Sequence, residues 1–246
     1  MRKEKFVIGD YVHVYNRGNR KELIVRDEKD KWRFMQGLRF FNDSHSSANI
    51  LRQISALKPD TSKLVELDRE PETVFEIGWP PNWPEKDPLV KILCYCLKPN
   101  HFHLLLQEIR EDGISKFMHK LGVGFANYYN AKHQEVGRIF QGPYKAKMVK
   151  GQIYLEYLSV YIQVINVLEL LPGGPKASFK NLDKALKFVE AYPFSSYPDY
   201  LGLRKSLIID KDLLGKIFPE QNDYRKFARD TIVGKKYETI GNLRID

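Results

Sequence analysis

The stretch LVKILCYCLKPNHFHLLLQEI, residues 89–109, constrains the fold more than any other part of the chain. Two apolar runs flank a turn that begins at Pro99, and this pattern predicts a β-hairpin. Side chains alternate between the two faces of a strand, so His101 and His103 share one face while Phe102 lies on the other. The hairpin therefore predicts one apolar face for the core and one face that carries paired imidazoles.

Helices and strands are expected on both sides of this hairpin. The segment YVHVYNRGN, residues 11–19, ends in a glycine turn and alternates as a strand does. Its less apolar face carries Tyr11, His13 and Tyr15. The further predicted elements are a helix over 27–41, a helix over 113–132, a strand within 137–149 and a helix over 152–171. This order favours an α+β fold: an antiparallel sheet of ferredoxin-like or RRM-like type, with helices on one face and the opposite face open.

The chain divides into a main domain and a tail on the same reasoning. We predict a domain over 1–171 and a mostly helical C-terminal extension over 172–246. Residues 42–88 are rich in serine, proline and charged residues, which is typical of an insertion or a long connection. Within that insertion we expect one short strand at 73–77.

Composition limits the classes of partner. The 246 residues contain 40 lysines and arginines against 31 acidic residues, a formal net charge of +9, which favours a polyanionic partner. Charged residues interrupt every run that approaches the roughly 18 apolar residues of a membrane helix, so no membrane partner is expected. The two cysteines, Cys94 and Cys96, are too close together on one strand for a disulfide framework, which favours a cytoplasmic protein.

Basic residues are concentrated between residues 114 and 150, where seven lysines and arginines accompany one acidic residue. Aromatic residues are interleaved with them, and cations that hold phosphates beside rings that stack on bases favour a nucleic-acid surface. The candidates for DNA binding are Arg17, Arg138, Gln141, Tyr144, Lys145 and Lys147.

Five segments together resemble one protein family. KPNHFHLLL is similar to the His-hydrophobic-His (HUH) motif of the IS200-like single-tyrosine transposases, and YLEYLSVYIQVINVLEL is similar to their tyrosine helix. YNRGN, GRIFQGPYKA and YPFSSYPDYLG resemble segments of the REP-associated tyrosine transposase branch. The five segments occur in the same order over most of residues 11–230, which makes the resemblance specific.

The resemblance implies that the domain over 1–171 cleaves and rejoins single-stranded or hairpin DNA. It implies Tyr161 as the nucleophile that forms a 5′-phosphotyrosine. It also implies that His101 and His103 are ligands of a divalent cation, Mg²⁺ or Mn²⁺, with no nucleotide cofactor and no small-molecule substrate. The long tail is similar to that of the branch thought to act as monomers, so a monomer is expected rather than a homodimer.

One departure from the family pattern concerns the third cation ligand. The family places an amide four residues after the tyrosine, but that position is Ile165, and the amide is Asn166. In a regular helix a spacing of five turns a side chain about 140° away. A one-residue π-bulge would bring it back, and such bulges occur at functional sites. We therefore predict that Asn166 ligates the cation through a π-bulge.

Three other interpretations compete with this one. Cys94 and Cys96 lie near the histidine pair, so a structural zinc site is conceivable. A nucleic-acid-binding module with an RRM-like sheet would use the same basic and aromatic surface while the histidines remain catalytically inactive. A replication-initiator nuclease would pair a tyrosine with a nearby lysine, and Tyr128 with Lys132 has that form.

Overall fold

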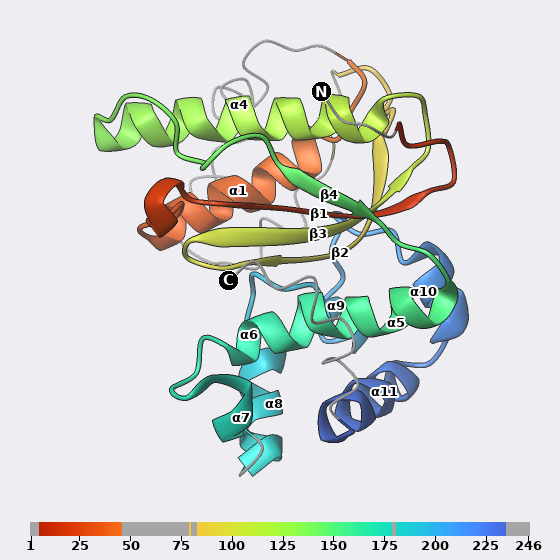
Figure 1. Cartoon of the computed structure of the whole chain (residues 1–246). Coiled ribbons are helices and arrows are strands. Elements are labelled where there is room, and N and C mark those ends of the chain that lie inside the picture. The colour runs from red at the N-terminus through yellow and green to blue at the C-terminus, as the bar shows by residue number, and fades with distance from the viewer. Residues whose placement is uncertain (1–4, 46–78, 80–82, 179–180, 235–246) are drawn as a thin grey trace, which may run out of the picture.

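The computed structural model describes residues 5–45, 79, 83–178 and 181–234 of the chain (Figure 1). Within these ranges, a four-stranded sheet forms in the order β2-β3-β1-β4, and every neighbouring pair is antiparallel. Its strands are β1 (Tyr11–Arg17), β2 (Val90–Leu97), β3 (His101–Glu108) and β4 (Lys145–Met148). Helix α1 (Glu28–Phe40) follows β1 and helix α4 (Gly113–His133) follows β3. The predicted α+β class, with its ferredoxin-like strand order, is confirmed.

The remaining helical elements come after β4, apart from one short 3-10 turn after β1. They are η1 (Asn19–Lys21), α5 (Gln152–Val160), the π-helical turn η3 (Tyr161–Ile165), α6 (Asn166–Leu168), α7 (Gly174–Ser178), α8 (Leu182–Glu190), α9 (Tyr197–Tyr200), α10 (Asp212–Ile217) and α11 (Gln221–Val233). None of the described helices is long and apolar enough to span a membrane.

One face of the sheet packs against α1 and α4, as predicted (Figure 1). The apolar positions of β1 and β3, such as Val14 and Leu104, meet Phe34 of α1 and Phe117 of α4 in a shared core. Helix α1 begins where expected, because the Asp27 carboxylate accepts a hydrogen bond from the backbone N–H of the third helical residue. Full burial of a large apolar side chain stabilises a fold by about 1.5–3 kcal/mol, so this layer is a principal source of stability.

The opposite face of the sheet is covered, although the sequence led us to expect it to be open. Helix α5, the turn η3 and α6 run beneath β2 and β3 (Figure 1). Helices α8 and α11 lie below this segment, on the side away from the sheet, and α10 contacts β2. The apolar stripe of this segment is the reason, because Leu158, Ile162 and Ile165 pack on Leu105 of β3 in a second core. The side chains of the second face are therefore enclosed between the sheet and this helical segment.

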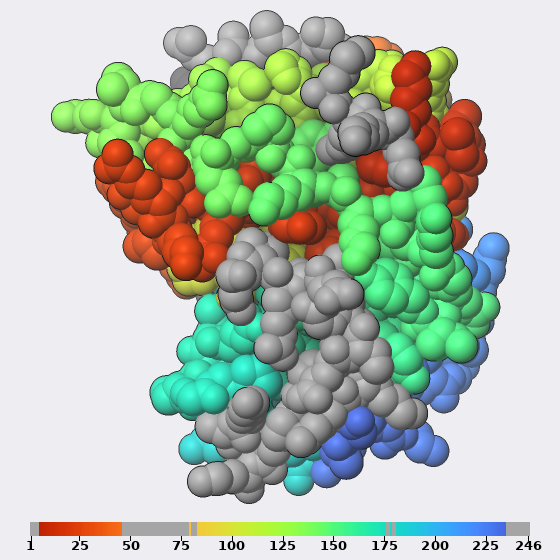
Figure 2. Space-filling model, viewed as in Figure 1, coloured from red at the N-terminus to blue at the C-terminus, as the bar shows by residue number. Residues whose placement is uncertain are grey.

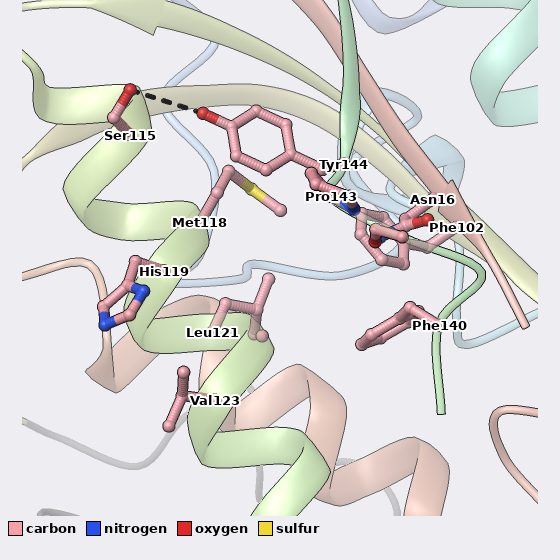
Figure 3. A pocket seen from close by; sticks show the side chains of 12 residues that line it. Asn16, Phe102, Ser115, Met118, His119, Leu121, Val123, Phe140, Pro143 and Tyr144 are labelled. Carbon is pink, nitrogen blue, oxygen red and sulfur yellow. Dashed lines mark hydrogen bonds between the residues drawn. The ribbon is translucent and has the colours of Figure 1, made fainter. Parts of the chain in front are cut away.

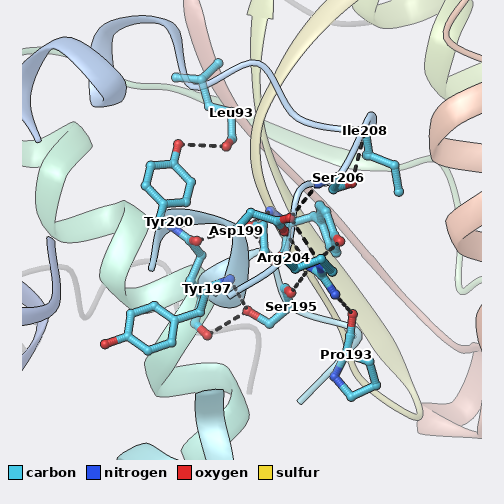
Figure 4. Close-up of polar contacts among 12 residues, drawn as sticks. Leu93, Pro193, Ser195, Tyr197, Asp199, Tyr200, Arg204, Ser206 and Ile208 are labelled. Atoms are coloured by element: carbon cyan, nitrogen blue, oxygen red, sulfur yellow. Dashed lines mark hydrogen bonds and ion pairs between the residues drawn. The ribbon is translucent and has the colours of Figure 1, made fainter. Parts of the chain in front are cut away.

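Polar contacts fasten the tail to strand β2. Arg204 makes a buried ion pair with Asp199 at 2.5 Å and donates a second hydrogen bond to the hydroxyl of Tyr95 on β2 (Figure 4). The backbone N–H of Leu97 donates to the carbonyl of Phe194 at 2.8 Å, so the tail also pairs with the edge of the sheet. The tail thus packs directly on the sheet, and the boundary between 171 and 172 stays a prediction.

The predicted insertion over 42–88 is described only at its ends, and the strand expected at 73–77 lies outside the described residues. At one end the Asn42 side chain bonds the backbone of Leu89 and Val90 at 2.9–3.0 Å. The Asp43 carboxylate accepts from the backbone N–H of Asp87 at 2.7 Å. The two ends of the segment therefore meet beside the start of β2.

Candidate active site

The two histidines of the HUH motif lie on the second face of the sheet. Both project from β3, and their ring centroids are 5.3 Å apart. His103 is fully buried and His101 is 7% exposed. The Nδ1 of His101 donates to the Oδ1 of Asn100 at 2.6 Å, which leaves the lone pair of this ring on Nε2. One imidazole of the pair is thus held in the tautomer that can ligate a cation through Nε2.

Tyr161 comes to this pair from a distant part of the chain. Its ring meets the His103 ring edge-on, with 5.6 Å between the centroids. Tyr161 is the first residue of the turn η3, and its side chain is 6% exposed. The structure therefore brings together the imidazole and the phenol that the sequence predicts to share a site.

The π-bulge predicted after Tyr161 is present as the turn η3. The backbone N–H of Asn166 donates to the carbonyl of Tyr161, five residues earlier, in place of the four-residue step of an α-helix. The extra residue returns Asn166 to the side of the helix that faces the sheet, where its amide also bonds the Tyr161 carbonyl at 2.9 Å. Asn166 is fully buried, and its amide lies close enough to His101 to affect the pKa of that imidazole.

His13 is a member of the site that the sequence did not single out. Its Nε2 is 2.9 Å from the Nδ1 of His103, and the ring centroids are 5.1 Å apart with 10° between the ring planes. The alternation of β1 placed His13 on the face opposite Val12 and Val14. The contact itself depends on the pairing of Tyr15 with His103 across β1 and β3. A long-range register of this kind leaves no local signal in the sequence.

Three buried polar atoms at this site have no hydrogen-bond partner among the described residues: Nδ1 of His13, Nε2 of His103 and Oδ1 of Asn166. Buried polar atoms are nearly always paired, so such atoms call for a ligand. An imidazole nitrogen and an amide oxygen are both ligands of divalent cations. Among the described residues, no three His, Cys, Asp or Glu side chains gather as a metal site. The residues fit a cation held by two imidazoles with the amide as third ligand.

Burial keeps the imidazoles neutral. It lowers the pKa of His101 to about 3, helped by the positive charges of Lys98 and Arg17, while the nearby Asn166 amide opposes the shift. Burial, with a smaller contribution from Lys147, also lowers the pKa of His13 to about 3. The pKa of His103 lies well below its ordinary value, again mainly through burial. Neutral imidazole is the form that binds metal ions.

An ion pair ties the histidine hairpin to the tyrosine helix. The Nζ of Lys98, in the turn between β2 and β3, bonds the carboxylate of Glu169 just after α6. Lys98 is 7% exposed, so this pair is well shielded from water on the lysine side. The pair links the turn that precedes His101 to the segment that follows Asn166, and therefore fixes the two halves of the site against each other.

Three of the predicted DNA-binding cations lie near the imidazoles. Lys145 and Lys147 of β4 pair with Tyr15 and His13 of β1, and both lysines are exposed. Arg17 pairs with His101 in the register of β1 and β3. Figure 2 shows this green segment beside the red β1 on one side of the molecule. The edge of the sheet next to the site is therefore positively charged.

The loop before β4 places the other candidates differently. Arg138 and Gln141 are exposed, and the backbone N–H of Gln141 donates to the carbonyl of Arg17 at 2.9 Å, which sets this loop beside the end of β1. Tyr144 instead points toward α4, where its hydroxyl lies 3.4 Å from the Oγ of Ser115 (Figure 3). It lines an apolar pocket with Met118 on the helix-covered face. The sheet separates Tyr144 from the imidazoles.

Two of the competing interpretations lack the geometry they need. Cys94 and Cys96 are free and fully buried, and burial raises the pKa of Cys96 to about 12, which disfavours the thiolate that zinc requires. Neither joins the histidines in a metal site within the described ranges. Tyr128 and Lys132 belong to α4, on the other face of the sheet, where Lys132 pairs with carboxylates of the α1 region. They do not reach the histidines.

The match to a protein family covers the centre of this site. Residues 85–164 match the family model described as IS200-like transposase. The resemblance to the IS200-like transposases is confirmed. The matched segment contains both histidines and Tyr161, while Asn166 lies two residues beyond its end. The part of the chain that matches this transposase family is thus the part that builds the imidazole and phenol cluster.

Other comparisons add a similar structure and no sequence relative. The solved structure of a REP-associated tyrosine transposase bound to a REP hairpin is similar to this chain, with a TM-score of 0.42 and 13% sequence identity. The similarity covers 85% of this chain and 88% of that chain. No curated protein matches the chain in sequence. Membership of the REP-associated branch stays a prediction.

Proposed function

We propose that this IS200-like chain cleaves and rejoins strands of single-stranded or hairpin DNA through a covalent 5′-phosphotyrosine on Tyr161. The observation that carries the proposal is the turn η3, because it puts Asn166 on the same side of the helix as a tyrosine that touches His103. In this proposal His101, His103 and Asn166 hold one divalent cation, Mg²⁺ or Mn²⁺.

The proposed reaction is a transesterification. The Tyr161 oxygen attacks the phosphorus, a bond from phosphorus to the tyrosine oxygen forms, and the bond from phosphorus to the 3′ oxygen breaks. The 3′ oxygen leaves as a hydroxyl that can reverse the step and rejoin the strand. When bound, the cation supplies a Lewis acid that neutralises charge on the phosphate.

The basic edge supplies the binding energy in this proposal. Exposed Lys145 and Lys147, with Arg17, lie around the imidazoles and hold backbone phosphates. Arg138 and Gln141 extend the same surface beyond the end of β1. Tyr144, on the far side of the sheet, contacts DNA only where the strand passes around the edge at β4. We further propose that the chain acts in the cytoplasm as a monomer and needs no small-molecule substrate.

The test is formation of a covalent adduct. A pool of end-labelled hairpins with single-stranded flanks of random sequence is incubated with Mn²⁺ and the full chain, and adducts are resolved on denaturing gels. We expect an adduct with the natural chain and its loss, by about 10⁴-fold or more, in the Tyr161→Phe variant. Tyr157→Phe is the matched control, since Tyr157 lies on the same helix but stacks on Phe227 of α11.

The alternative is a catalytically inactive nucleic-acid-binding module. The orphaned buried atoms favour the enzyme, because a purely structural site has no use for unpaired Nε2 and Oδ1 atoms. Binding of the hairpin pool without any adduct from the natural chain would establish the module and refute the enzyme. An adduct that persists in Tyr161→Phe would show that another residue is the nucleophile.

A further inference from the structure

His13 holds the inner imidazole of the site by a contact to which the proposed function assigns no role. We infer that His13 is a positioning residue that fixes the tautomer of His103, so that the Nε2 lone pair of His103 faces the proposed cation. The inference rests on the proposed function, because it gives His13 its task through that cation site.

The distance between the two facing ring nitrogens requires a single proton between them. Nε2 of His13 and Nδ1 of His103 are 2.9 Å apart, a hydrogen-bond distance for two nitrogens. One of them must donate and the other accept, since two N–H groups would repel and two lone pairs would not bond. Both side chains are fully buried, so each ring depends on the other for this bond.

Only one of the two arrangements leaves a lone pair on Nε2 of His103, the atom that we propose binds the cation. If Nδ1 of His103 donates, its Nε2 carries a lone pair that can bind a cation. If Nε2 of His13 donates, the neutral His103 ring carries its proton on Nε2. That N–H would be buried without a partner among the described residues, as the Nδ1–H of His13 is in the first arrangement, and it would leave Nε2 of His103 unable to bind a cation. A bound cation therefore selects the first arrangement, in which His13 is the acceptor.

The neighbouring histidine is fixed in the same way by a different residue. The Oδ1 of Asn100 accepts from Nδ1 of His101 at 2.6 Å and leaves Nε2 of that ring available. His13 performs the same service for His103 from a separate strand. Both proposed ligand rings thus have an acceptor at Nδ1, and for His103 that acceptor is His13.

His13 is placed to orient His103 and not to bind the cation itself. Its Nε2 is occupied by His103, and the three histidines do not form a metal site within the described part of the chain. The groups that face His13 are the ring of Tyr15 on its own strand, the ring of His103 on β3, and the charge of Lys147 on β4. The two ring planes differ by only 10°, so the hydrogen bond between the nitrogens runs close to the plane of each ring.

Two substitutions separate orientation from packing. His13→Leu fills the space with an apolar side chain and removes the acceptor. His13→Gln keeps an acceptor oxygen at a similar reach. Mn²⁺ affinity, measured from the electron paramagnetic resonance signal of free Mn²⁺, is expected to fall about tenfold to a hundredfold in His13→Leu and to remain near that of the natural chain in His13→Gln. Melting temperatures identify any variant that fails to fold.

A second readout reports the tautomer directly. Nitrogen-15 spectra of the imidazoles in the natural chain, with and without Mg²⁺, are expected to show His103 protonated at Nδ1. Protonation at Nε2 of His103 would overturn the inference whatever the affinities are, and it decides the matter if His13→Leu does not fold. Unchanged Mn²⁺ affinity in a folded His13→Leu, or equal losses in both variants, would also overturn it.

The proposed function fails in a distinguishable way. His103→Ala is expected to abolish Mn²⁺ binding. If His103→Ala binds Mn²⁺ as the natural chain does, the cation lies elsewhere and the proposed active site is wrong. If no protein in the series binds Mn²⁺ and His103 is protonated at Nδ1 in the natural chain, the positioning contact stands and only the cation is refuted.

Discussion

The two faces of the sheet use the same strands for different purposes. Along β1 and β3, Val14 and Leu104 are buried against α1 and α4, while His13 and His103 are buried on the other face, where the His103 ring meets Tyr161 of η3. The first face packs apolar side chains of the sheet against apolar side chains of the two helices. The second buries imidazoles, with Nε2 of His103 left unpaired. The first face is thus an apolar core, whereas the second combines an apolar core with buried polar atoms that have no partner among the described residues.

The largest expected effect tests the face covered by α1 and α4. Phe117→Ala removes a fully buried ring from α4 and should lower the free energy of unfolding by about 3–5 kcal/mol. Urea denaturation measures this loss. Mn²⁺ affinity in the folded variant should match that of the natural chain. A loss of Mn²⁺ affinity under native conditions would show that the two faces are not separate.

The next effect is a pH dependence that belongs to the histidine face. His13 and His101 have an ordinary pKa of 6.5 and a folded pKa of about 3, so the unfolded chain binds more protons between these values. Stability should therefore be complete above pH 6.5 and fall as the pH decreases toward 3. The slope is up to about 1.4 kcal/mol per pH unit for each imidazole.

Denaturation in urea over this pH range measures the slope, and His101→Gln should remove its own share. Phe117→Ala should lower the whole curve without changing the part of the slope that His101 supplies. A slope that is the same in His101→Gln and the natural chain would contradict the assignment of this pH dependence to the histidine face.

The smallest effect concerns the basic edge of the sheet beside the histidine face. Replacing Lys145 and Lys147 together with alanine should weaken binding of single-stranded DNA and reduce the slope of log affinity against log salt by about 1.4. Fluorescence anisotropy at several salt concentrations measures this slope. Lys184 and Lys187, exposed on α8, provide the matched control, and their replacement should leave the slope unchanged. Equal effects of the two pairs would mean that the lysines of β4 contribute no more to DNA binding than the lysines of α8.

Local patterns were enough to predict the parts of the fold and site that depend on neighbouring residues. The hairpin, the two faces of β3 and the cap at Asp27 each follow from a few consecutive side chains. The π-turn followed from the spacing between Tyr161 and Asn166, once the resemblance had marked Tyr161 as the site tyrosine.

Features that depend on long-range pairing did not follow from the sequence. The contact between His13 and His103 requires the register of β1 against β3. The packing of the tail on the sheet requires it to return to β2, where Arg204 and Phe194 hold it. Tyr144 was grouped with the basic residues around it, but the short strand β4 turns it to the helix side of the sheet.

The π-turn also bears on how a proposed cation site of this kind is recognised in a sequence. Counting four residues onward from Tyr161 arrives at Ile165, an aliphatic side chain, and a search built on that count would discard the chain as inactive. The single extra residue in η3 shifts the amide by one position in the sequence and keeps it on the side of the helix that faces the sheet. Motif definitions for such sites should therefore accept either step.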